Sequence, residues 1–350
     1  MKKKKLAVII GRFQPCHNGH IELIKYAYTQ AENVLILIGS ANAAPDIENP
    51  FSWTTRANLL SDSLPENINI DFQPIADFLY SNQDWLEQVQ TVVAKAQREI
   101  GLIEGYPILD GDTAIVGHKK DSTSFYLDDF PQWEFVEFNK VSVYSAAHIR
   151  EFLFKGHVEY AKGHIPSPVY QFLSDFKSNP EGRRLVGEYS FHIDYQKQFA
   201  GSKYPPKFIT VDATCFCKGH VLLVKRRSHP GKGLWALPGG FLEDMEEIEN
   251  GIYRELREET GFNIRNGISH VKYFSAPKRS LRGRTITFVG LIDVDATSKN
   301  NNLSLPKVKG SDDAEKAKWF PLSEFRKMER KLFEDHYHIV NTMVDILQSK

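Results

Sequence analysis

Short apolar runs alternate with stretches of helical periodicity through the first half of the chain. LAVII (6–10) and NVLILIGS (33–40) are apolar almost throughout, as is typical of strands buried in a parallel sheet. Between them, residues 20–31 place their apolar side chains at the spacing of an amphipathic helix. Strand and helix patterns continue to alternate, which predicts an α/β domain with a doubly wound parallel sheet. The other predicted elements of this half are strands at 68–75, 113–118 and 133–138, helices at 54–64, 85–100 and 165–176, and a helix that begins at Ser145.

The pattern changes near residue 180. KSNPEGRR (177–184) is polar and contains proline and glycine, which predicts a linker. Because no internal repeat is present, we expect two different domains, at 1–180 and 187–350. The elements expected in the second domain are a hairpin-like strand pair at 207–216 and 219–227, a helix at 245–260, strands at 270–275 and 284–293, a loop at 297–306 and a closing helix at 331–348.

Composition narrows the range of partners and compartments. The chain has 350 residues and zero formal net charge, so it lacks the basic excess typical of proteins that bind nucleic acid or membranes. No apolar run approaches the roughly 18 residues of a membrane span, and 6–10 is too short for the core of a signal peptide. The cysteines Cys16, Cys215 and Cys217 are few, odd in number and without a CxxC pair. They argue against a disulfide framework or a zinc site, so we expect a reducing cytoplasm.

The decapeptide GRFQPCHNGH follows the first predicted strand and leads into the first predicted helix. A glycine-containing turn at this place favours a bound phosphate, because free N–H groups and the helix dipole both attract an anion. Gly11 and Gly19 let the backbone approach closely, and Arg12 supplies a fixed positive charge. His17 and His20 are three residues apart and can both donate to one phosphate. The alternative for each histidine is packing or capping.

This decapeptide resembles the HxGH signature of the nucleotidyltransferase superfamily. HxGH alone also fits pantetheine-phosphate adenylyltransferases and cytidylyltransferases, but the preceding GRFQP is similar to archaeal-type nicotinamide-mononucleotide adenylyltransferases. The resemblance covers roughly residues 5–170. It implies transfer of AMP from ATP to nicotinamide mononucleotide, giving NAD and pyrophosphate without a covalent enzyme intermediate. It also implies catalysis by His17, His20, Arg150 and Mg²⁺, and ATP contacts from Gly11, Arg12, Phe13, Gly19, Gly117, His118 and Ser145.

Three further segments are similar to this family. The family's SxTxxR helix start is matched by Ser145 and Arg150, but Ala147 replaces the threonine and removes one hydroxyl donor. The alternative for Ser145 is a plain N-cap, but the spacing to Arg150 and the basic GHKKD (117–121) upstream favour a phosphate role.

Two of these segments concern the mononucleotide. NPFSWTTRANLL (49–60) implies that Arg56 binds its phosphate. Asp84 and Trp85 resemble a position where tryptophan stacks on the nicotinamide ring, the alternative being a core tryptophan on a helix.

A second candidate site lies in GFLEDMEEIENGIYRELREETGF (240–262). Glu255, Glu258 and Glu259 share one face of the predicted helix, where three like charges are unfavourable unless a cation lies among them. Oxygen ligands of this kind favour Mg²⁺ or Mn²⁺, and Arg254 is placed to orient them. The alternative is a solvated acidic helix face.

The spacing of this segment matches every fixed position of the Nudix box, and WALPGG (235–240) leads into it as in that family. The resemblance covers roughly 187–350. It implies an α/β/α sandwich with a mixed sheet and metal-assisted hydrolysis of a nucleoside diphosphate linked to another group. It also implies a catalytic set of Arg254, Glu258 and Glu259, and a metal site built by Gly240, Glu246, Glu255, Glu258 and Glu259, with Glu246 as an outer support. The candidate general bases are Asp312, Asp313 and Glu315.

The segment APKRSLRGRTITF (276–288) gives information on the substrate of the second domain. This stretch resembles a basic segment of ADP-ribose-acting Nudix enzymes, so Arg279, Arg282 and Arg284 are candidate contacts, with a solvated hairpin as the alternative. The pairing of domains favours ADP-ribose, because a hydrolase that cut NAD would destroy the first domain's product.

The sequence therefore predicts a bifunctional enzyme of NAD metabolism, similar to fused nicotinamide-mononucleotide adenylyltransferase and Nudix proteins of bacteria. Its expected small-molecule partners are ATP, nicotinamide mononucleotide, NAD and ADP-ribose, and a homo-oligomer is compatible with the sequence. Nicotinate mononucleotide or another phosphate remains an alternative acceptor. For the second domain, a different nucleoside diphosphate or a role as a sensor of ADP-ribose or NAD remains an alternative.

Overall fold

The computed structural model describes residues 3–118, 127–139, 142–297 and 304–349. The chain divides into two units, Met1–Val186 and Gly187–Lys350. Most of the predicted loop at 297–306 and residues 119–121 of the predicted basic segment lie outside the described residues. No helix among the described residues is long and apolar enough to cross a membrane.

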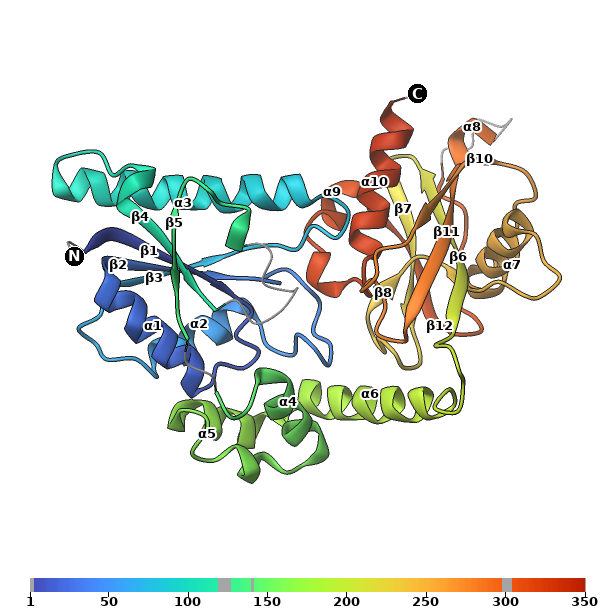
Figure 1. The fold of residues 1–350 in the computed structure, drawn as a ribbon. Coiled ribbons are helices and arrows are strands. Elements are labelled where there is room, and N and C mark those ends of the chain that lie inside the picture. Colours follow the sequence, from blue (N-terminus) through green and yellow to red (C-terminus); the bar gives the residue numbers. More distant parts are fainter. Residues whose placement is uncertain (1–2, 119–126, 140–141, 298–303, 350) are drawn as a thin grey trace. The chain divides into compact units, whose positions relative to one another are not determined.

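The first unit is built on a parallel sheet with the strand order β3-β2-β1-β4-β5 (Figure 1). The predicted order of strands and helices is confirmed. The elements are β1 (Lys4–Gly11), α1 (Asn18–Gln30), β2 (Ala31–Ile38), α2 (Trp53–Ser61), β3 (Ile70–Pro74), α3 (Asn82–Glu104), η1 (Asp110–Asp112), β4 (Thr113–Gly117), β5 (Glu134–Glu137), α4 (Ala146–Lys155), η3 (Val158–Ala161) and α5 (Ser167–Phe176).

The central strands are apolar on both faces because helices cover both. Helix α3 lies on one face of the sheet, and α1 and α2 lie on the other (Figure 1). Leu6 and Val8 of β1 and Leu35 of β2 are buried in one cluster with Val89 and Val93 of α3. This double burial explains why the sequence shows continuous apolar runs instead of alternation.

The strand order places a topological switch point at β1. This strand pairs with β2 on one side and with β4 on the other, both in parallel. In open α/β sheets of this kind, ligands bind outside the carboxyl ends of the strands at such a point. The segment that follows β1 is the decapeptide with the two histidines, and β4 ends at Gly117.

The second unit is built on a mixed sheet with the path β10-β11-β6-β7-β12, with β8 paired to β7 and β9 to β6. Strands β11 and β6 are parallel, and the other pairs are antiparallel. The elements are β6 (Lys207–Cys217), β7 (His220–Arg226), β8 (Trp235–Ala236), β9 (Gly239–Phe241), α7 (Ile248–Thr260), β10 (Ile268–Phe274), β11 (Arg284–Asp293), α8 (Val294–Thr297), β12 (Ala314–Pro321), α9 (Leu322–Phe325), η4 (Glu329–Lys331) and α10 (His336–Gln348).

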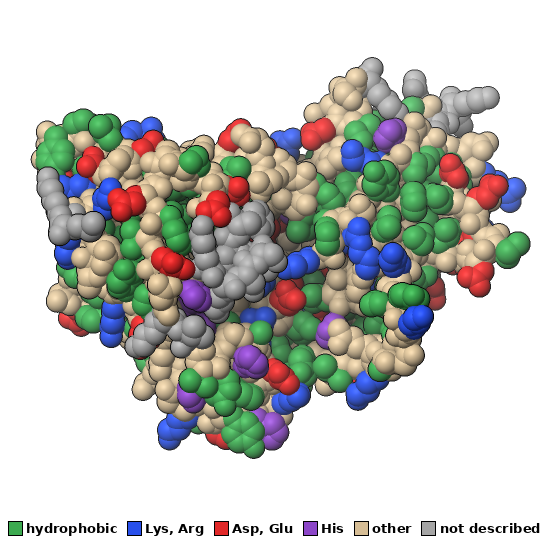
Figure 2. Space-filling model, viewed as in Figure 1, with side chains coloured by type: hydrophobic (Ala, Val, Ile, Leu, Met, Phe, Trp, Pro, Cys, Tyr) green, Lys and Arg blue, Asp and Glu red, His purple; other side chains and the backbone are tan. Residues whose placement is uncertain are grey.

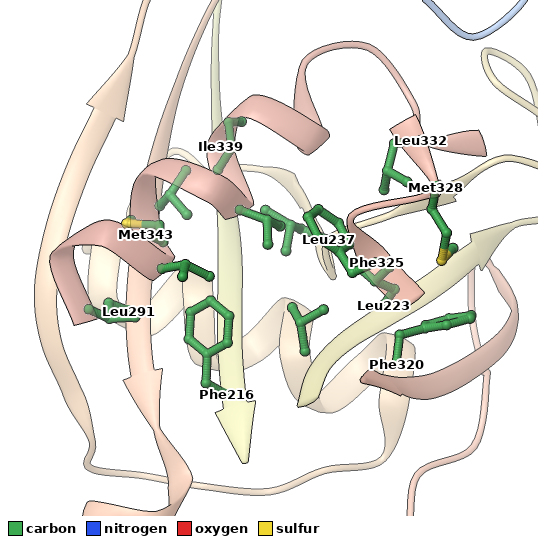
Figure 3. Close-up of a cluster of buried hydrophobic side chains, with 14 of the residues drawn as sticks. Phe216, Leu223, Leu237, Leu291, Phe320, Phe325, Met328, Leu332, Ile339 and Met343 are labelled. Carbon is green, nitrogen blue, oxygen red and sulfur yellow. The ribbon is translucent and has the colours of Figure 1, made fainter. Parts of the chain in front are cut away.

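Alternate residues of these strands face opposite layers. Phe216 of β6 joins the cluster that also contains Ile339 and Met343 of α10, as Figure 3 shows. Its neighbours Cys215 and Cys217 join the opposite cluster, on the side of α7. The sheet is therefore sandwiched between α10 and α7, and the predicted α/β/α architecture is confirmed. All three cysteines are free and buried, as small core residues.

The predicted linker at 177–184 is wrong, because a helix, α6 (Pro180–Lys197), begins within it. Proline fits the first turn of a helix, where its missing N–H costs nothing. The Asn179 side chain accepts a hydrogen bond from Gly182 N–H at 2.7 Å, and Glu181 lies in the first turn. The proline and glycine therefore mark a helix start. The closing helix is also shorter than predicted, because η4 and a non-helical stretch precede His336.

Candidate functional sites

The two histidines of the decapeptide lie stacked where α1 begins. His17 is the N-cap residue and is buried, and its ring centroid is 3.7 Å from that of His20, with an angle of 25° between the planes. The backbone N–H of His17 donates to Nδ1 of His20 at 3.2 Å. Because Nδ1 accepts this bond, a neutral His20 carries its proton on Nε2, on the other side of the ring.

The glycines of this turn are required by close packing. A Cβ at Gly19 would lie 3.1 Å from the His17 ring and 2.8 Å from Ser142. A Cβ at Gly11 would lie 2.9 Å from the ring of Phe13. That ring is buried and packs edge-on against His20 at 4.9 Å, so Phe13 fixes the histidine from one side. The contacts of Gly11, Phe13 and Gly19 with ATP stay predictions.

Arg150 and Arg12 converge beside this turn. Arg150, on α4, donates from Nε to the carbonyl of Ile47 at 3.1 Å and from Nη1 to that of Gln14 at 2.7 Å. Burial lowers the pKa of Arg150, and the nearby Arg12 guanidinium lowers it further. Arg12 is exposed and 3.5 Å from Glu48. The carboxylates of Glu48 and Asp46 offset part of this lowering of the Arg150 pKa, and a bound anion would stabilise the Arg150 charge further.

Arg56 is buried, with only 1% of the residue exposed. It donates to four backbone carbonyl groups, in the loops that follow β1 and β2 and just before α2. The acceptors are the oxygens of Arg12, Gly39, Ser40 and Ser52. These contacts favour a positioning role in the loops, and the predicted contact with the mononucleotide phosphate stays a prediction.

Three further residues of the first unit are predicted to contact ATP: Ser145, Gly117 and His118. Ser145 is the N-cap residue of α4, and its hydroxyl lies 3.0 Å from Nδ1 of His148, which agrees with the capping alternative. Gly117 is buried at the end of β4, where a Cβ would lie 3.0 Å from Leu127. His118 follows it and is partly buried. Phosphate contacts by these residues stay predictions.

Asp84 and Trp85 lie in the first turn of α3. Asp84 is exposed, and its N–H donates to the N-cap hydroxyl of Ser81 at 3.2 Å. Trp85 is partly buried against the core, with its ring 5.9 Å from that of Phe130. The structure thus gives this ring a core role, and stacking on nicotinamide stays a prediction.

Two residues of the decapeptide hold the loops around the site, and the sequence interpretation assigned neither of them a role. The buried amide of Gln14 binds both backbone groups of Phe51, donating to its oxygen and accepting from its N–H, each at 3.0 Å. Asn18 donates from its backbone to His164 and from its side chain to Gly163. Both are polar residues inside a motif, which was the signal in the sequence, but the groups that Gln14 and Asn18 bind lie far away in the chain.

In the second unit, Arg254 connects the carboxylates of the predicted metal site. Its Nε and Nη2 donate to the two oxygens of Glu246 at 2.8 and 2.9 Å. Its Nη1 donates to Glu255 at 2.7 Å and to Glu258 at 3.2 Å. The hydrogen bonds to Glu246 are the main reason that the pKa of Arg254 is raised and that of Glu246 is lowered. This geometry agrees with an orienting role for Arg254.

Glu255 and Glu259 are the buried members of the set. Burial raises the pKa of both, that of Glu259 to about 8, although Gly239 N–H donates to Glu259 at 3.0 Å and partly offsets this. The Glu255 carboxylate adds to the rise at Glu259. A Cβ at Gly240 would lie 2.5 Å from Glu255 Oε1, so a larger residue there would displace this carboxylate. Glu258 is partly exposed.

These residues fit a divalent cation. Carboxylates whose pKa is raised by burial and by neighbouring carboxylates are stabilised by a positive ion, and an all-oxygen set suits Mg²⁺ or Mn²⁺. Within the described part of the chain, however, no group of three or more acidic, histidine or cysteine side chains surrounds a single point closely enough to hold a metal. Arg254 instead binds Glu255 and Glu258.

Asp212 belongs to this site and was missed in the sequence. It lies buried on β6, accepts a hydrogen bond from the Thr287 hydroxyl, and has its pKa raised to about 6 by burial. The pairing of β6 with β9 places Asp212 opposite Gly239, where a Cβ would lie 2.3 Å from Asp212 Oδ1. The signal was an aspartate within the otherwise apolar KFITVDATCF (207–216).

The loop that holds two of the predicted general bases is attached to the end of α7. Ser311 N–H donates to the Glu259 carbonyl at 3.1 Å, and the Ser311 hydroxyl donates to the Glu258 carbonyl. Asp312 and Asp313 follow and are exposed. Glu315 instead forms an ion pair with Lys225 at 3.4 Å. The identity of the base stays a prediction.

The three arginines of 276–288 differ in their surroundings. Arg279 is 4% exposed and forms a two-point ion pair with the fully buried Asp335, at 2.9 and 2.8 Å. This favours a core role, and its contact with ADP-ribose stays a prediction. Arg284 donates to the carbonyl of Ser275 at 2.6 Å. Arg282 is partly exposed and stacks over the ring of Phe241, 5.2 Å from its centroid.

Comparison with known families assigns both halves. A family model described as a cytidylyltransferase-like domain matches residues 8–151, and one described as a NUDIX domain matches residues 207–343. A nicotinamide/nicotinic acid mononucleotide adenylyltransferase of Acinetobacter baylyi is 32% identical over 54% of this chain and 95% of its own length. An ADP-ribose pyrophosphatase of Methanocaldococcus jannaschii is 34% identical over 37% of this chain and 72% of its own length.

A solved structure matches both units together. It is a bifunctional NMN adenylyltransferase/ADP ribose pyrophosphatase of Francisella tularensis, complexed with AMP and a manganese ion. It is 34% identical to this chain and has a TM-score of 0.87, and the match covers 98% of this chain and 99% of that chain. The match therefore includes both halves of this chain.

Proposed function

This chain belongs to the family of bifunctional NMN adenylyltransferase/ADP-ribose pyrophosphatase proteins, and from this premise we propose that it catalyses both reactions. The first unit transfers AMP from ATP to nicotinamide mononucleotide, and the second hydrolyses ADP-ribose to AMP and ribose 5-phosphate. The observation that carries the proposal is that each unit holds the charged groups its reaction needs, within the part of the chain that is similar to its relatives.

In the first reaction, a phosphate oxygen of the mononucleotide attacks the α-phosphorus of ATP. A new phosphorus–oxygen bond forms, the bond to the β-phosphate bridge breaks, and pyrophosphate leaves. Negative charge is spread over the phosphates during this step, so fixed donors stabilise it. His20 offers Nε2–H, and Arg12 and Arg150 supply the two converging guanidinium groups beside the N-terminus of α1.

In the second reaction, water attacks one phosphorus of the diphosphate and the bridging bond breaks, giving AMP and ribose 5-phosphate. A bound divalent ion, for which we propose Mg²⁺, supplies an activated water and neutralises the diphosphate. Glu255, Glu258 and Glu259 would hold it, with the carbonyl of Gly240 and with Glu246 as outer support. Arg254 keeps the carboxylates in place. We propose Asp312 or Asp313 as the base, since Ser311 ties their loop to α7.

The compartment is proposed on separate grounds. All three cysteines are free and buried, which agrees with a reducing cytoplasm.

The test separates the two activities within one protein. The full chain with Mg²⁺ is incubated with ATP and nicotinamide mononucleotide, with ADP-ribose, and with NAD, and the products are separated by chromatography. His20→Ala should lose most NAD synthesis and keep ADP-ribose hydrolysis, whereas Glu259→Gln should do the reverse. Each variant is thus the folding control of the other.

Other outcomes would replace parts of the proposal. AMP released from NAD would contradict the substrate of the second unit. ADP-ribose that binds without being cleaved would favour the sensor alternative. A faster reaction with nicotinate mononucleotide would make that nucleotide the acceptor of the first unit.

A further inference from the structure

Phe241 is an exposed aromatic residue beside the predicted metal ligands. It follows Gly240 directly, ends β9, and is 44% exposed. Its carbonyl accepts a hydrogen bond from Arg254 Nη2 at 3.0 Å, the same guanidinium that holds Glu246 and Glu255. The backbone that carries the ring is therefore held close to the carboxylates, although Phe241 takes no part in the hydrolytic step described above.

Other aromatic rings support Phe241 from one side. Phe208 packs edge-on against it, with ring centroids 5.8 Å apart. Phe208 in turn contacts Tyr195 at 5.7 Å and Phe199 at 5.6 Å. A backed and partly exposed ring is a platform on which a flat ligand can stack with little loss of side-chain freedom. Figure 2 shows hydrophobic side chains reaching the surface of the second unit close to Lys and Arg side chains.

Arg282 now stacks over this ring. Its guanidinium carbon lies 5.2 Å from the Phe241 centroid, which is too close for a second aromatic ring to fit between them. Its Nε also donates a long hydrogen bond of 3.5 Å to the Ser280 hydroxyl, and its charge lowers the pKa of Glu334, whose pKa burial raises. A cation over an exposed ring is held more weakly than a stacked nucleobase, so a base can take its place. The displaced guanidinium carries a charge suited to a neighbouring diphosphate.

We propose that Phe241 is the stacking platform for the aromatic base of the dinucleotide-like substrate of the second unit, and that Arg282 moves from the ring to the diphosphate when the base binds. The inference rests on the function proposed for that unit. It extends this function by assigning the base, the one aromatic part of ADP-ribose, to a surface that no metal ligand occupies. The sugar at the other end of the substrate lacks a flat face and gains nothing from this ring.

The first test uses steady-state hydrolysis of ADP-ribose by the full chain. Phe241→Ala should raise KM by about tenfold and leave kcat within about twofold, because stacking holds substrate and transition state equally. Phe241→Tyr keeps a ring and should stay close to the parent. The matched control is Tyr273→Ala, which removes an exposed aromatic ring from edge strand β10. An unchanged KM in Phe241→Ala, or a loss confined to kcat, would overturn the proposal.

The second test does not depend on hydrolysis. The full chain with Mn²⁺ is irradiated with 8-azido-AMP, and labelled peptides are identified by mass spectrometry. Labelling of the peptide that contains Phe241 should be suppressed by AMP but not by ribose 5-phosphate, and should be lost in Phe241→Ala. Labelling of the second unit only at other peptides would refute the platform. If ADP-ribose is not cleaved yet the Phe241 peptide is labelled, the proposed reaction fails and the base subsite stands.

Discussion

Asp335→Asn should destabilise the second unit strongly, because it leaves Arg279 buried without its counter-charge. The side chains of Asp335 and Arg279 are 0% and 2% exposed, and two hydrogen bonds of 2.8 and 2.9 Å join them. Asparagine has nearly the same size as aspartate and keeps one acceptor. The substitution therefore removes the charge and one hydrogen bond while creating almost no cavity.

The magnitude follows from the degree of burial. Removing one partner of a buried ion pair costs about 3–5 kcal/mol, whereas the same change at the surface costs about 1 kcal/mol or less. For a unit the size of Gly187–Lys350, about 4 kcal/mol corresponds to a fall in Tm of roughly 8–16 °C. That is a large fraction of the total stability of an ordinary domain, which is about 5–15 kcal/mol.

Urea unfolding of the full chain measures this effect, with NAD synthesis and ADP-ribose hydrolysis followed as separate reporters of the two units. The transition that abolishes hydrolysis should move to lower urea, and the one that abolishes NAD synthesis should not. Replacing both partners, as Arg279→Leu with Asp335→Leu, should recover part of the loss. An unfolding free energy within about 1 kcal/mol of the parent, together with a raised KM for ADP-ribose, would refute the reasoning and restore Arg279 as a ligand contact.

Three further predictions concern the two sites. Mg²⁺ binding to the second unit should strengthen as pH rises from 6 to 8.5, because burial raises the pKa of Glu259 to about 8 and the metal has to displace its proton. Titration calorimetry of the full chain measures the affinity, and an affinity that does not change with pH would contradict this prediction. Gly240→Ala should reduce ADP-ribose hydrolysis at least tenfold with NAD synthesis unchanged, since its Cβ would lie 2.5 Å from Glu255 Oε1; activity equal to the parent would show that the carboxylate moves freely. Arg56→Met should destabilise the first unit by about 3 kcal/mol or more and reduce NAD synthesis, because it leaves four backbone carbonyls without their donor. A normal melting curve with only a raised KM for the mononucleotide would favour the phosphate contact instead.

The sequence was most informative where the chemistry is local. The two histidines are separated by one turn, and the glutamates of α7 lie on one helix face, so their spacing alone predicts that they come together. The apolar runs predict a parallel sheet for the same reason, since burial on both faces removes alternation. Asp212 could not be placed in this way. Its position beside the glutamates depends on the pairing of β6 with β9 and on the hydrogen bond from Gly239 to Glu259, which join segments far apart in the chain.

The arginines show why residue type alone was insufficient at both sites. A guanidinium in a family motif indicates a phosphate contact, but the side chain is long enough to point inward and serve the backbone or a buried carboxylate instead. Arg56 and Arg279 have done so, and each is less than 5% exposed. Arg12 and Arg282 keep exposed surface and are held by long contacts of about 3.5 Å, to Glu48 and to Ser280. A side chain with exposed surface and long contacts can turn to an arriving anion more easily than Arg56 and Arg279, which would have to break four or two short bonds inside the protein. Burial and bond length therefore separate these two arginines from Arg12 and Arg282, but they do not settle the role of Arg150, which also has two short bonds to backbone carbonyls.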